Sequence, residues 1–126
     1  MGYRSDVAIK VYGYDEDNAK FKELFYQELD KLKPDVQDIV CDWLEHAHLT
    51  CPIFADTGFA FYIADVKWYD DYEHVNFFMT MFRTAEVDLN MNGEYARIGD
   101  ELADIEYTTF GDECDFRIEF NRTIKI

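Results

Sequence analysis

Residues 94–126, EYARIGDELADIEYTTFGDECDFRIEFNRTIKI, decide the fold expected for this chain. Over residues 114–126, apolar and polar side chains alternate, and this period of two predicts a strand with one buried and one exposed face. The apolar positions are Cys114, Phe116, Ile118, Phe120, Ile124 and Ile126, interrupted only by Arg122. The chain is therefore expected to end in a long strand.

Two further strands are expected just before this one, near 94–99 and 102–109. A tight turn at Gly99-Asp100 separates them, and a second turn at Gly111-Asp112 leads into the last strand. The three strands together predict a C-terminal three-stranded meander.

The rest of the chain predicts two strands and three helices. The expected elements are a strand over 4–12, a helix over 16–32, a second helix from Pro34, a loop over 49–57, a strand over 58–68 and a helix over 71–84. Apolar residues at helical spacing indicate the helices, although 75–82 also fits a buried strand. The order predicts an α+β fold, a mostly antiparallel sheet of about five strands with about three helices packed on one face.

The composition predicts a single acidic domain spanning residues 1–126. Apolar residues make up 48% of the chain and aromatic residues 17%, which favours a packed core over disorder. The 27 Asp and Glu residues outnumber the 12 Lys and Arg residues, so the formal net charge is −15. Such a charge repels nucleic acids and anionic membranes and attracts basic protein surfaces or cations.

The expected location is the cytoplasm. No apolar run reaches the roughly 18–20 residues that a membrane span needs, and the N-terminus lacks the apolar core of a signal peptide. The three cysteines, an odd number, argue against a disulfide framework. We therefore expect no contact with a membrane and no direct contact with nucleic acid.

One cluster of residues has the chemistry of a zinc site: Cys41, His46, His48 and Cys51. Zinc binds thiolates and imidazoles, but no C-x-x-C pair occurs and His46 lies on a different helix face from Cys41 and His48. Cys41 falls near the apolar stripe of its helix, so we expect a small core residue there. We predict no metal and no other cofactor.

Paired carboxylates are the only feature that suggests catalysis. Asp104 and Glu106 share one face of a predicted strand, and such pairs serve glycosidases and metal-dependent nucleases. Close pairs arise by chance among 27 acids, and charge on a strand also discourages edge-to-edge aggregation. The chain has no G-x-S-x-G, no phosphate-binding glycine loop and no H-E-x-x-H. We predict no catalytic residue and no enzymatic activity.

The C-terminal meander carries a series of acidic residues with no Lys or Arg among them. These residues are Asp100, Glu101, Asp104, Glu106, Asp112, Glu113 and Asp115. Carboxylates fixed at strand spacing and facing water imitate a row of phosphates, and a basic partner relieves their mutual repulsion. We predict them as the partner-binding residues. The alternative is an acidic face that only keeps the protein soluble.

The chain resembles small bacteriophage and prophage proteins in three places. These are the start Met1-Gly2-Tyr3-Arg4-Ser5-Asp6-Val7, the group Lys67-Trp68-Tyr69 with Tyr72 and Val75, and residues 97–106, RIGDELADIE. The third is similar to R-I-G-E-D-x-x-D-I-E, with Asp100-Glu101 in place of the usual Glu-Asp order. The resemblance implies a phage origin and a counter-defence role such as that of anti-CRISPR inhibitors, and it implies no chemistry.

Charge and resemblance together favour a non-catalytic inhibitor acting in the host-cell cytoplasm. It would bind the basic, nucleic-acid-handling surface of a host defence protein by acidic mimicry. One alternative is a small-ligand binder, such as a sponge for a nucleotide signal, with Tyr62, Trp68 and Tyr69 stacking on a base. Another is a homo-oligomeric phage accessory protein.

Overall fold

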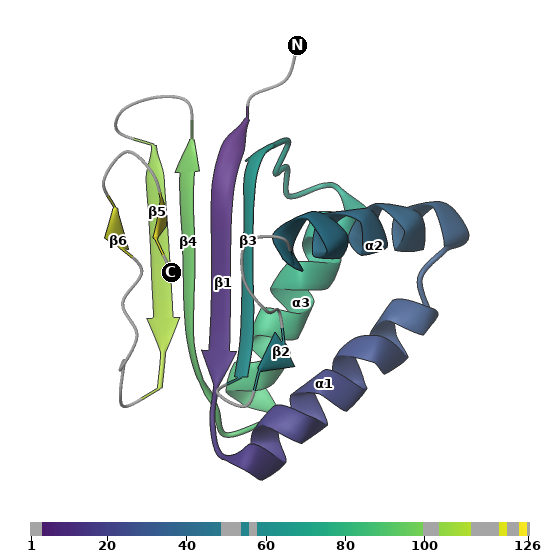
Figure 1. Ribbon diagram of the computed structural model, residues 1–126, viewed down its shortest axis with the longest axis vertical. Coiled ribbons are helices and arrows are strands. Elements are labelled where there is room, and N and C mark those ends of the chain that lie inside the picture. The colour runs from purple at the N-terminus through teal and green to yellow at the C-terminus, as the bar shows by residue number, and fades with distance from the viewer. Residues whose placement is uncertain are drawn as a thin grey trace.

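The computed structural model describes residues 4–48, 54–55, 58–99, 104–111, 119–120 and 124–125. The elements in chain order are β1 (Ser5–Tyr12), α1 (Asp15–Asp30), α2 (Pro34–His48), β2 (Phe54–Ala55), β3 (Gly58–Val66), α3 (Glu73–Val87), β4 (Asn92–Gly99), β5 (Ile105–Phe110), β6 (Glu119–Phe120) and β7 (Ile124–Lys125) (Figure 1). The predicted α+β class is confirmed. The helix expected over 71–84 is α3, so the alternative of a buried strand there is wrong.

An antiparallel sheet forms the centre of the molecule, with the strand order β2-β3-β1-β4-β5. The N-terminal strand β1 is central and pairs with β3 on one side and β4 on the other. Its register places Val7 opposite Ile63 of β3 and opposite Arg97 of β4. Four of the strands are long, while β2 contributes two residues beside the start of β3.

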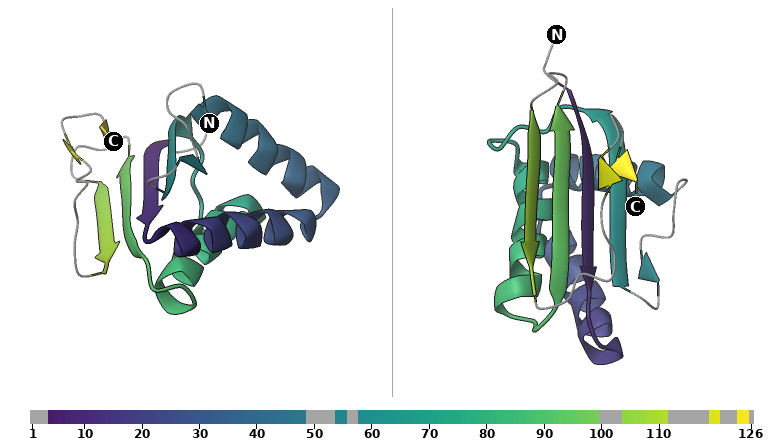
Figure 2. Two further views of the ribbon diagram at one scale, coloured as in Figure 1. Left: turned by 60° about the horizontal axis from the view of Figure 1, so that its bottom comes forward. Right: turned by 90° about the vertical axis from the view of Figure 1, so that its left-hand side faces the viewer.

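The three helices all cover the same face of the sheet (Figure 2). Their apolar residues meet those of the strands in a core rich in phenylalanine. Phe25 of α1 lies 5.0 Å from Phe77 and 5.5 Å from Phe59 between ring centroids, and Phe61 lies 4.5 Å from Phe78. Each fully buried ring of this size contributes about 1.5–3 kcal/mol through the hydrophobic effect. The core therefore fixes how α1 and α3 sit on the sheet.

The opposite face of the sheet is also buried at its centre, on β1 and β4. Ala8, Ala96 and Ile98 form a small apolar cluster there. Beside it, Lys10 and Glu94 lie opposite each other in the β1–β4 register and are 9% and 0% exposed. In both views of Figure 2, β6 and β7 lie on this side of the sheet, away from the helices. The C-terminal strands thus lie over the second face.

The C-terminal end differs from the predicted meander. The hairpin of β4 and β5 is present, but β6 and β7 pair with each other in a separate two-stranded sheet. Glu119 lies opposite Lys125 and Phe120 opposite Ile124. The prediction of one long strand over 114–126 is therefore wrong. The alternating pattern covers two short antiparallel strands, β6 and β7. Because each strand of a hairpin has the same period of two, the pattern does not distinguish a hairpin from one long strand.

Candidate functional site

Two of the predicted partner-binding residues, Asp104 and Glu106, lie within the described residues, and both contact Arg97 of β4. Arg97 donates to the Asp104 carboxylate from Nη1 at 3.1 Å and from Nη2 at 2.7 Å. Its Nε donates to Glu106 Oε1 at 2.6 Å, and its Nη1 also donates to Ser5 Oγ at 2.9 Å. These contacts join β1, β4 and β5.

This cluster neutralises part of the acidic surface within the protein itself. The Arg97 side chain is only 12% exposed, compared with 29% for Asp104 and 56% for Glu106. Burial disfavours the guanidinium charge, but the hydrogen bonds to Asp104 and Glu106 outweigh it and raise the pKa of Arg97. The expectation that these two carboxylates face water without a basic neighbour is wrong, because the register places Arg97 opposite Glu106.

The other predicted partner-binding residues lie outside the described residues. They are Asp100, Glu101, Asp112, Glu113 and Asp115. Their role, like that of Asp104 and Glu106, stays a prediction.

A second acidic surface lies on α2, and we call it the acidic stripe. It consists of the exposed residues Asp35, Asp38, Asp42 and Glu45. They follow each other at intervals of three or four residues, so they share one side of the helix. Helix α2 contains no Lys or Arg, and in the part of the chain that the structure describes, the only ion pair made by the stripe joins Asp42 to His46.

The acidic stripe is the solvent side of an amphipathic helix. Val36, Val40 and Ala47 are buried on the opposite side, facing the core. This apolar pattern predicts the helix, but sequence reasoning missed the stripe that complements it. The signal was present in the spacing of the four acids and in the lack of Lys or Arg between Pro34 and His48. An ordinary solvated helix face mixes both signs of charge.

His46 is attached to the stripe through Asp42. Its Nδ1 lies 2.8 Å from the carbonyl oxygen of Asp42 and 3.7 Å from Oδ1 of the same residue. The hydrogen bond to the carbonyl and the nearby carboxylate raise the pKa of His46 above its ordinary value. The imidazole is 65% exposed, so water screens its charge strongly.

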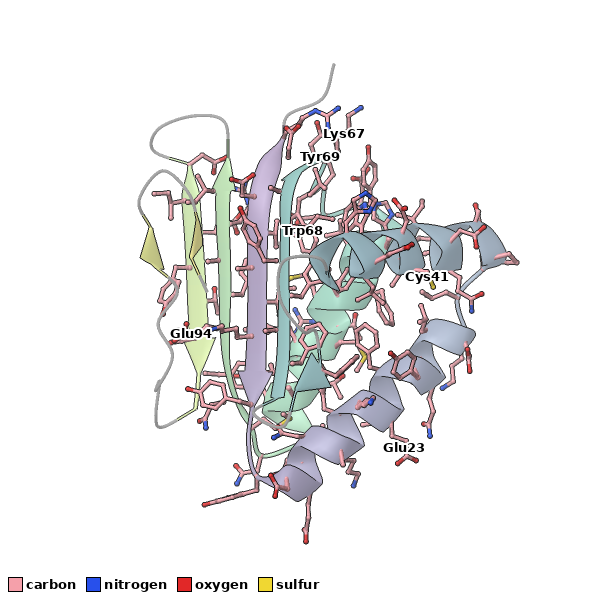
Figure 3. The ribbon with its side chains drawn as sticks, in the orientation of Figure 1. Glu23, Cys41, Lys67, Trp68, Tyr69 and Glu94 are labelled. Carbon is pink, nitrogen blue, oxygen red and sulfur yellow. The ribbon has the colours of Figure 1, made fainter. Side chains whose placement is uncertain are left out.

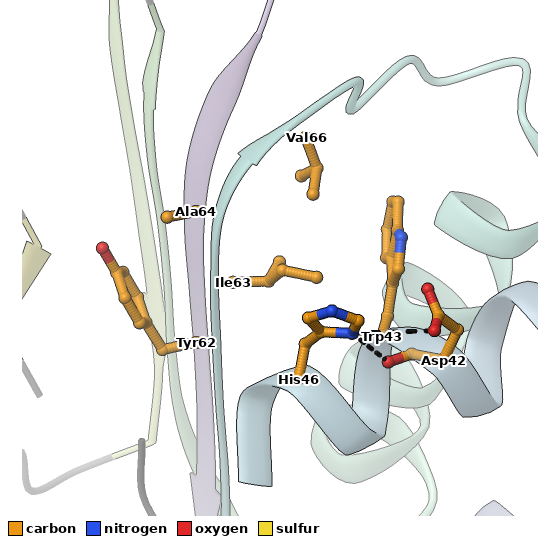
Figure 4. Close-up of a pocket in the computed structure, with 7 residues that line it drawn as sticks. All are labelled: Asp42, Trp43, His46, Tyr62, Ile63, Ala64 and Val66. Atoms are coloured by element: carbon orange, nitrogen blue, oxygen red, sulfur yellow. Dashed lines mark hydrogen bonds and ion pairs between the residues drawn. The ribbon is translucent and has the colours of Figure 1, made fainter. Parts of the chain in front are cut away.

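A pocket of about 380 Å³ opens between α2 and β3 (Figure 4). Helix α2 contributes Asp42, Trp43 and His46, so the pocket begins where the acidic stripe ends. Strand β3 contributes Tyr62, Ile63, Ala64 and Val66. Figure 4 shows that Ile63 points towards the helix, whereas Tyr62 lies on the other side of the strand. No Lys or Arg is present among the lining residues that the structure describes.

The aromatic residues predicted to stack on a base lie in different places. Trp68 is 6% exposed, and its ring packs against Trp43, Phe78 and Tyr95 in the core (Figure 3). Tyr69 is in edge contact with Tyr72. Only Tyr62 lines the pocket. The three rings therefore do not form one stacking platform.

The residues considered as zinc ligands are only partly described. Cys41 is exposed on α2, so the prediction that it is a small core residue is wrong. It follows the buried Val40 and lies on the side of the helix that faces away from the core. Cys51 and the side chain of His48 lie outside the described part. Among the side chains that are described, no group of three or more His, Cys, Asp or Glu residues is placed to hold a metal ion.

The comparisons with known proteins give no family for this chain. No protein-family model, no curated protein and no solved structure matches it. Within the described residues, none of the helices has the length and apolar character needed to cross a membrane.

Proposed function

We propose that the protein is a non-catalytic inhibitor of phage type that binds a basic, nucleic-acid-handling surface of a host defence protein. The acidic stripe of α2 is the main contact surface, and the acids predicted in the C-terminal region are a second candidate contact. The observation that carries the proposal is the stripe itself, four exposed carboxylates on one side of a helix that has no Lys or Arg.

The geometry of the stripe supports mimicry of a nucleic acid. Residues three or four apart on a helix rise by about 4.5–6 Å along its axis. Phosphates along one DNA strand rise by about 3.4 Å each. The stripe is therefore a straight row of fixed negative charge, somewhat sparser than a phosphate backbone. Since α2 packs on the core through Val36 and Val40, the row is held rigidly and loses little conformational entropy on binding.

The net charge of the chain and its resemblance to phage proteins support the kind of target proposed. A net charge of −15 on a chain of 126 residues steers it towards cationic surfaces at long range. The similarity of the segments at 1–7 and 97–106 to phage proteins supports a host defence protein as the target. Proteins that handle nucleic acid carry the required basic grooves.

The test is competition for DNA on a panel of purified, guide-loaded CRISPR effector nucleases. Fluorescence anisotropy of labelled target DNA reports displacement by the protein at about 50 mM and about 200 mM salt. We expect displacement at the lower salt concentration, weakened at least tenfold at the higher one. A variant of the acidic stripe, Asp35→Asn with Asp38→Asn, Asp42→Asn and Glu45→Gln, is expected to lose at least tenfold in potency.

A matched control separates the stripe from net charge. The variant with Glu23→Gln, Asp30→Asn, Glu86→Gln and Asp88→Asn removes the same charge from exposed positions on α1 and at the end of α3. We expect its potency to fall less than about threefold. Equal losses in both variants would mean that net charge alone acts. The proposal is contradicted if the stripe variant displaces DNA as potently as the unmodified protein, or if no nuclease of the panel is inhibited.

The pocket beside α2 supports small-ligand binding as a second candidate function. Its volume of about 380 Å³ lies within the range of small-molecule sites. The carboxylate of Asp42 favours a cation over an anionic nucleotide, so a nucleotide sponge is the weaker form of this alternative. A thermal shift on adding a nucleotide, unchanged by salt, would support the sponge instead of the inhibitor.

A further inference from the structure

The groove between α2 and β3 combines a charged helix with a strand edge that is mostly unpaired within the described residues. Strand β3 pairs with β2 only at Gly58 and Phe59. From Ala60 to Val66, no strand of the described chain pairs with its outer edge. An edge of this kind presents unpaired N–H and C=O groups, and an extended peptide can join it by backbone hydrogen bonds.

The helix side of the groove has the chemistry that binds a cation. The Asp42 side chain is 63% exposed, so its carboxylate is accessible from the solvent. Trp43 is half-buried, and its ring is held in place by Trp68 at 5.8 Å and His74 at 4.7 Å between ring centroids. A carboxylate beside an indole favours a guanidinium, which forms charge-assisted hydrogen bonds and stacks on aromatic rings.

Charge complementarity decides between the occupants of this groove. A second copy of the chain also carries a net charge of −15, so it is repelled by this acidic surface. A nucleotide brings negative phosphates next to Asp42, whose carboxylate repels them. A segment rich in arginine is attracted to Asp42 in the groove and to the other carboxylates of the acidic stripe on the same helix.

We propose that the groove receives an extended basic segment of the partner protein, which pairs with the outer edge of β3 and places an arginine side chain against Asp42 and Trp43. This inference rests on the proposed function, because it identifies the part of the basic partner that meets α2. Backbone pairing with β3 sets the position of the segment, and the acidic stripe holds its other cations.

The test uses the full chain and the synthetic peptide acetyl-Val-Arg-Val-Arg-Val-amide. Alternation places both arginines on the side of the added strand that faces α2. Calorimetric titration is expected to show binding, and NMR is expected to show shifted amide signals for Tyr62, Ile63 and Ala64. Asp42→Asn is expected to weaken binding about tenfold, since it removes one charge-assisted contact. Asp30→Asn, an exposed change on α1, is the matched control and leaves binding unchanged.

Two modified peptides separate the contributions of side chain and backbone. Replacing arginine by the uncharged citrulline is expected to abolish binding, and methylating the backbone nitrogens is expected to abolish it while the charge remains. The proposal is overturned if the methylated peptide binds equally well, if Asp42→Asn has no effect, or if the arginine peptide does not bind.

The outcomes distinguish this inference from the proposed function. If the peptide fails to bind while the stripe variant still loses inhibition, the groove proposal is wrong and the inhibitor proposal stands. If the peptide binds as described and no nuclease is inhibited, groove binding stands and the inhibitor proposal is wrong.

Discussion

At the scale of single residues, Arg97 shows how tertiary structure changes the meaning of a sequence pattern. Between Asp100 and Asp115 the sequence contains only acids among its charged residues, which predicts an unrelieved negative surface. Arg97 lies just outside that segment in sequence but opposite Glu106 across the β4–β5 hairpin. The hairpin therefore supplies the cation that the segment lacks.

Replacing Arg97 by methionine tests how much this cluster contributes to the stability of the fold. We expect Arg97→Met to lower the free energy of unfolding by about 2–3 kcal/mol, because it removes the guanidinium that donates to both carboxylates and to Ser5. Urea unfolding followed by circular dichroism measures the change.

Two further variants make this prediction specific. Arg97→Met combined with Asp104→Asn and Glu106→Gln is expected to recover part of the loss, since the repulsion between the carboxylates is removed. Arg83→Met, an exposed change on α3, is the control and is expected to cost less than about 0.5 kcal/mol. A loss no larger than that of Arg83→Met would show that the Arg97 hydrogen bonds contribute little.

At the scale of elements, α2 has a charge pattern that opposes its own stability. Its acids Asp42 and Glu45 lie towards the C-terminal end of the helix, where the macrodipole is negative and cations are preferred. No Lys or Arg is present in the helix to offset them. Such a pattern is typical of residues kept for binding at some cost in stability.

The variant Glu45→Gln tests this trade-off. We expect it to raise the free energy of unfolding by about 0.3–1 kcal/mol through the helix dipole, while weakening displacement of DNA in the competition assay. Thermal unfolding and anisotropy measured on the same sample check both parts. A less stable variant would indicate that Glu45 makes a favourable contact within the fold.

At the scale of the whole molecule, we expect net charge to determine whether copies of the protein associate through β5. Strand β5 is the last strand of the described sheet, and Ile105 and Tyr107 on it are 48% and 46% exposed. Exposed apolar edge strands associate readily. At neutral pH, a charge of −15 on each copy opposes this association.

We expect the protein to be monomeric at low salt and neutral pH, and to associate in about 1 M salt, where the screening length is about 3 Å. It is also expected to associate near pH 4.3, its isoelectric point. Light scattering measures the mass in each condition. Ile105→Lys is expected to suppress association, whereas Val87→Lys, at a 71% exposed site on α3, is not. If both changes suppress association equally, the copies do not associate through β5.

Much of the fold follows from local patterns. The helix predicted over 16–32 is α1, and the strands predicted over 4–12 and 58–68 are β1 and β3. The exposure of Cys41 and the β6–β7 reversal were not predicted. Helical periodicity predicts a broad apolar face but does not show whether a residue at its border, such as Cys41, is buried. A period of two is the same on both strands of a hairpin, so it does not reveal where β6 ends and β7 begins.

The sequence by itself determined the α+β class, the positions of the long elements and the strongly acidic character. These depend on side-chain periodicity and on a sum of charges, neither of which needs distant contacts. Only the tertiary structure decided that Arg97 contacts Asp104 and Glu106, and that Asp42 and Trp43 line one pocket with residues of β3. Such pairings depend on strand register and helix packing, which join residues far apart in the chain.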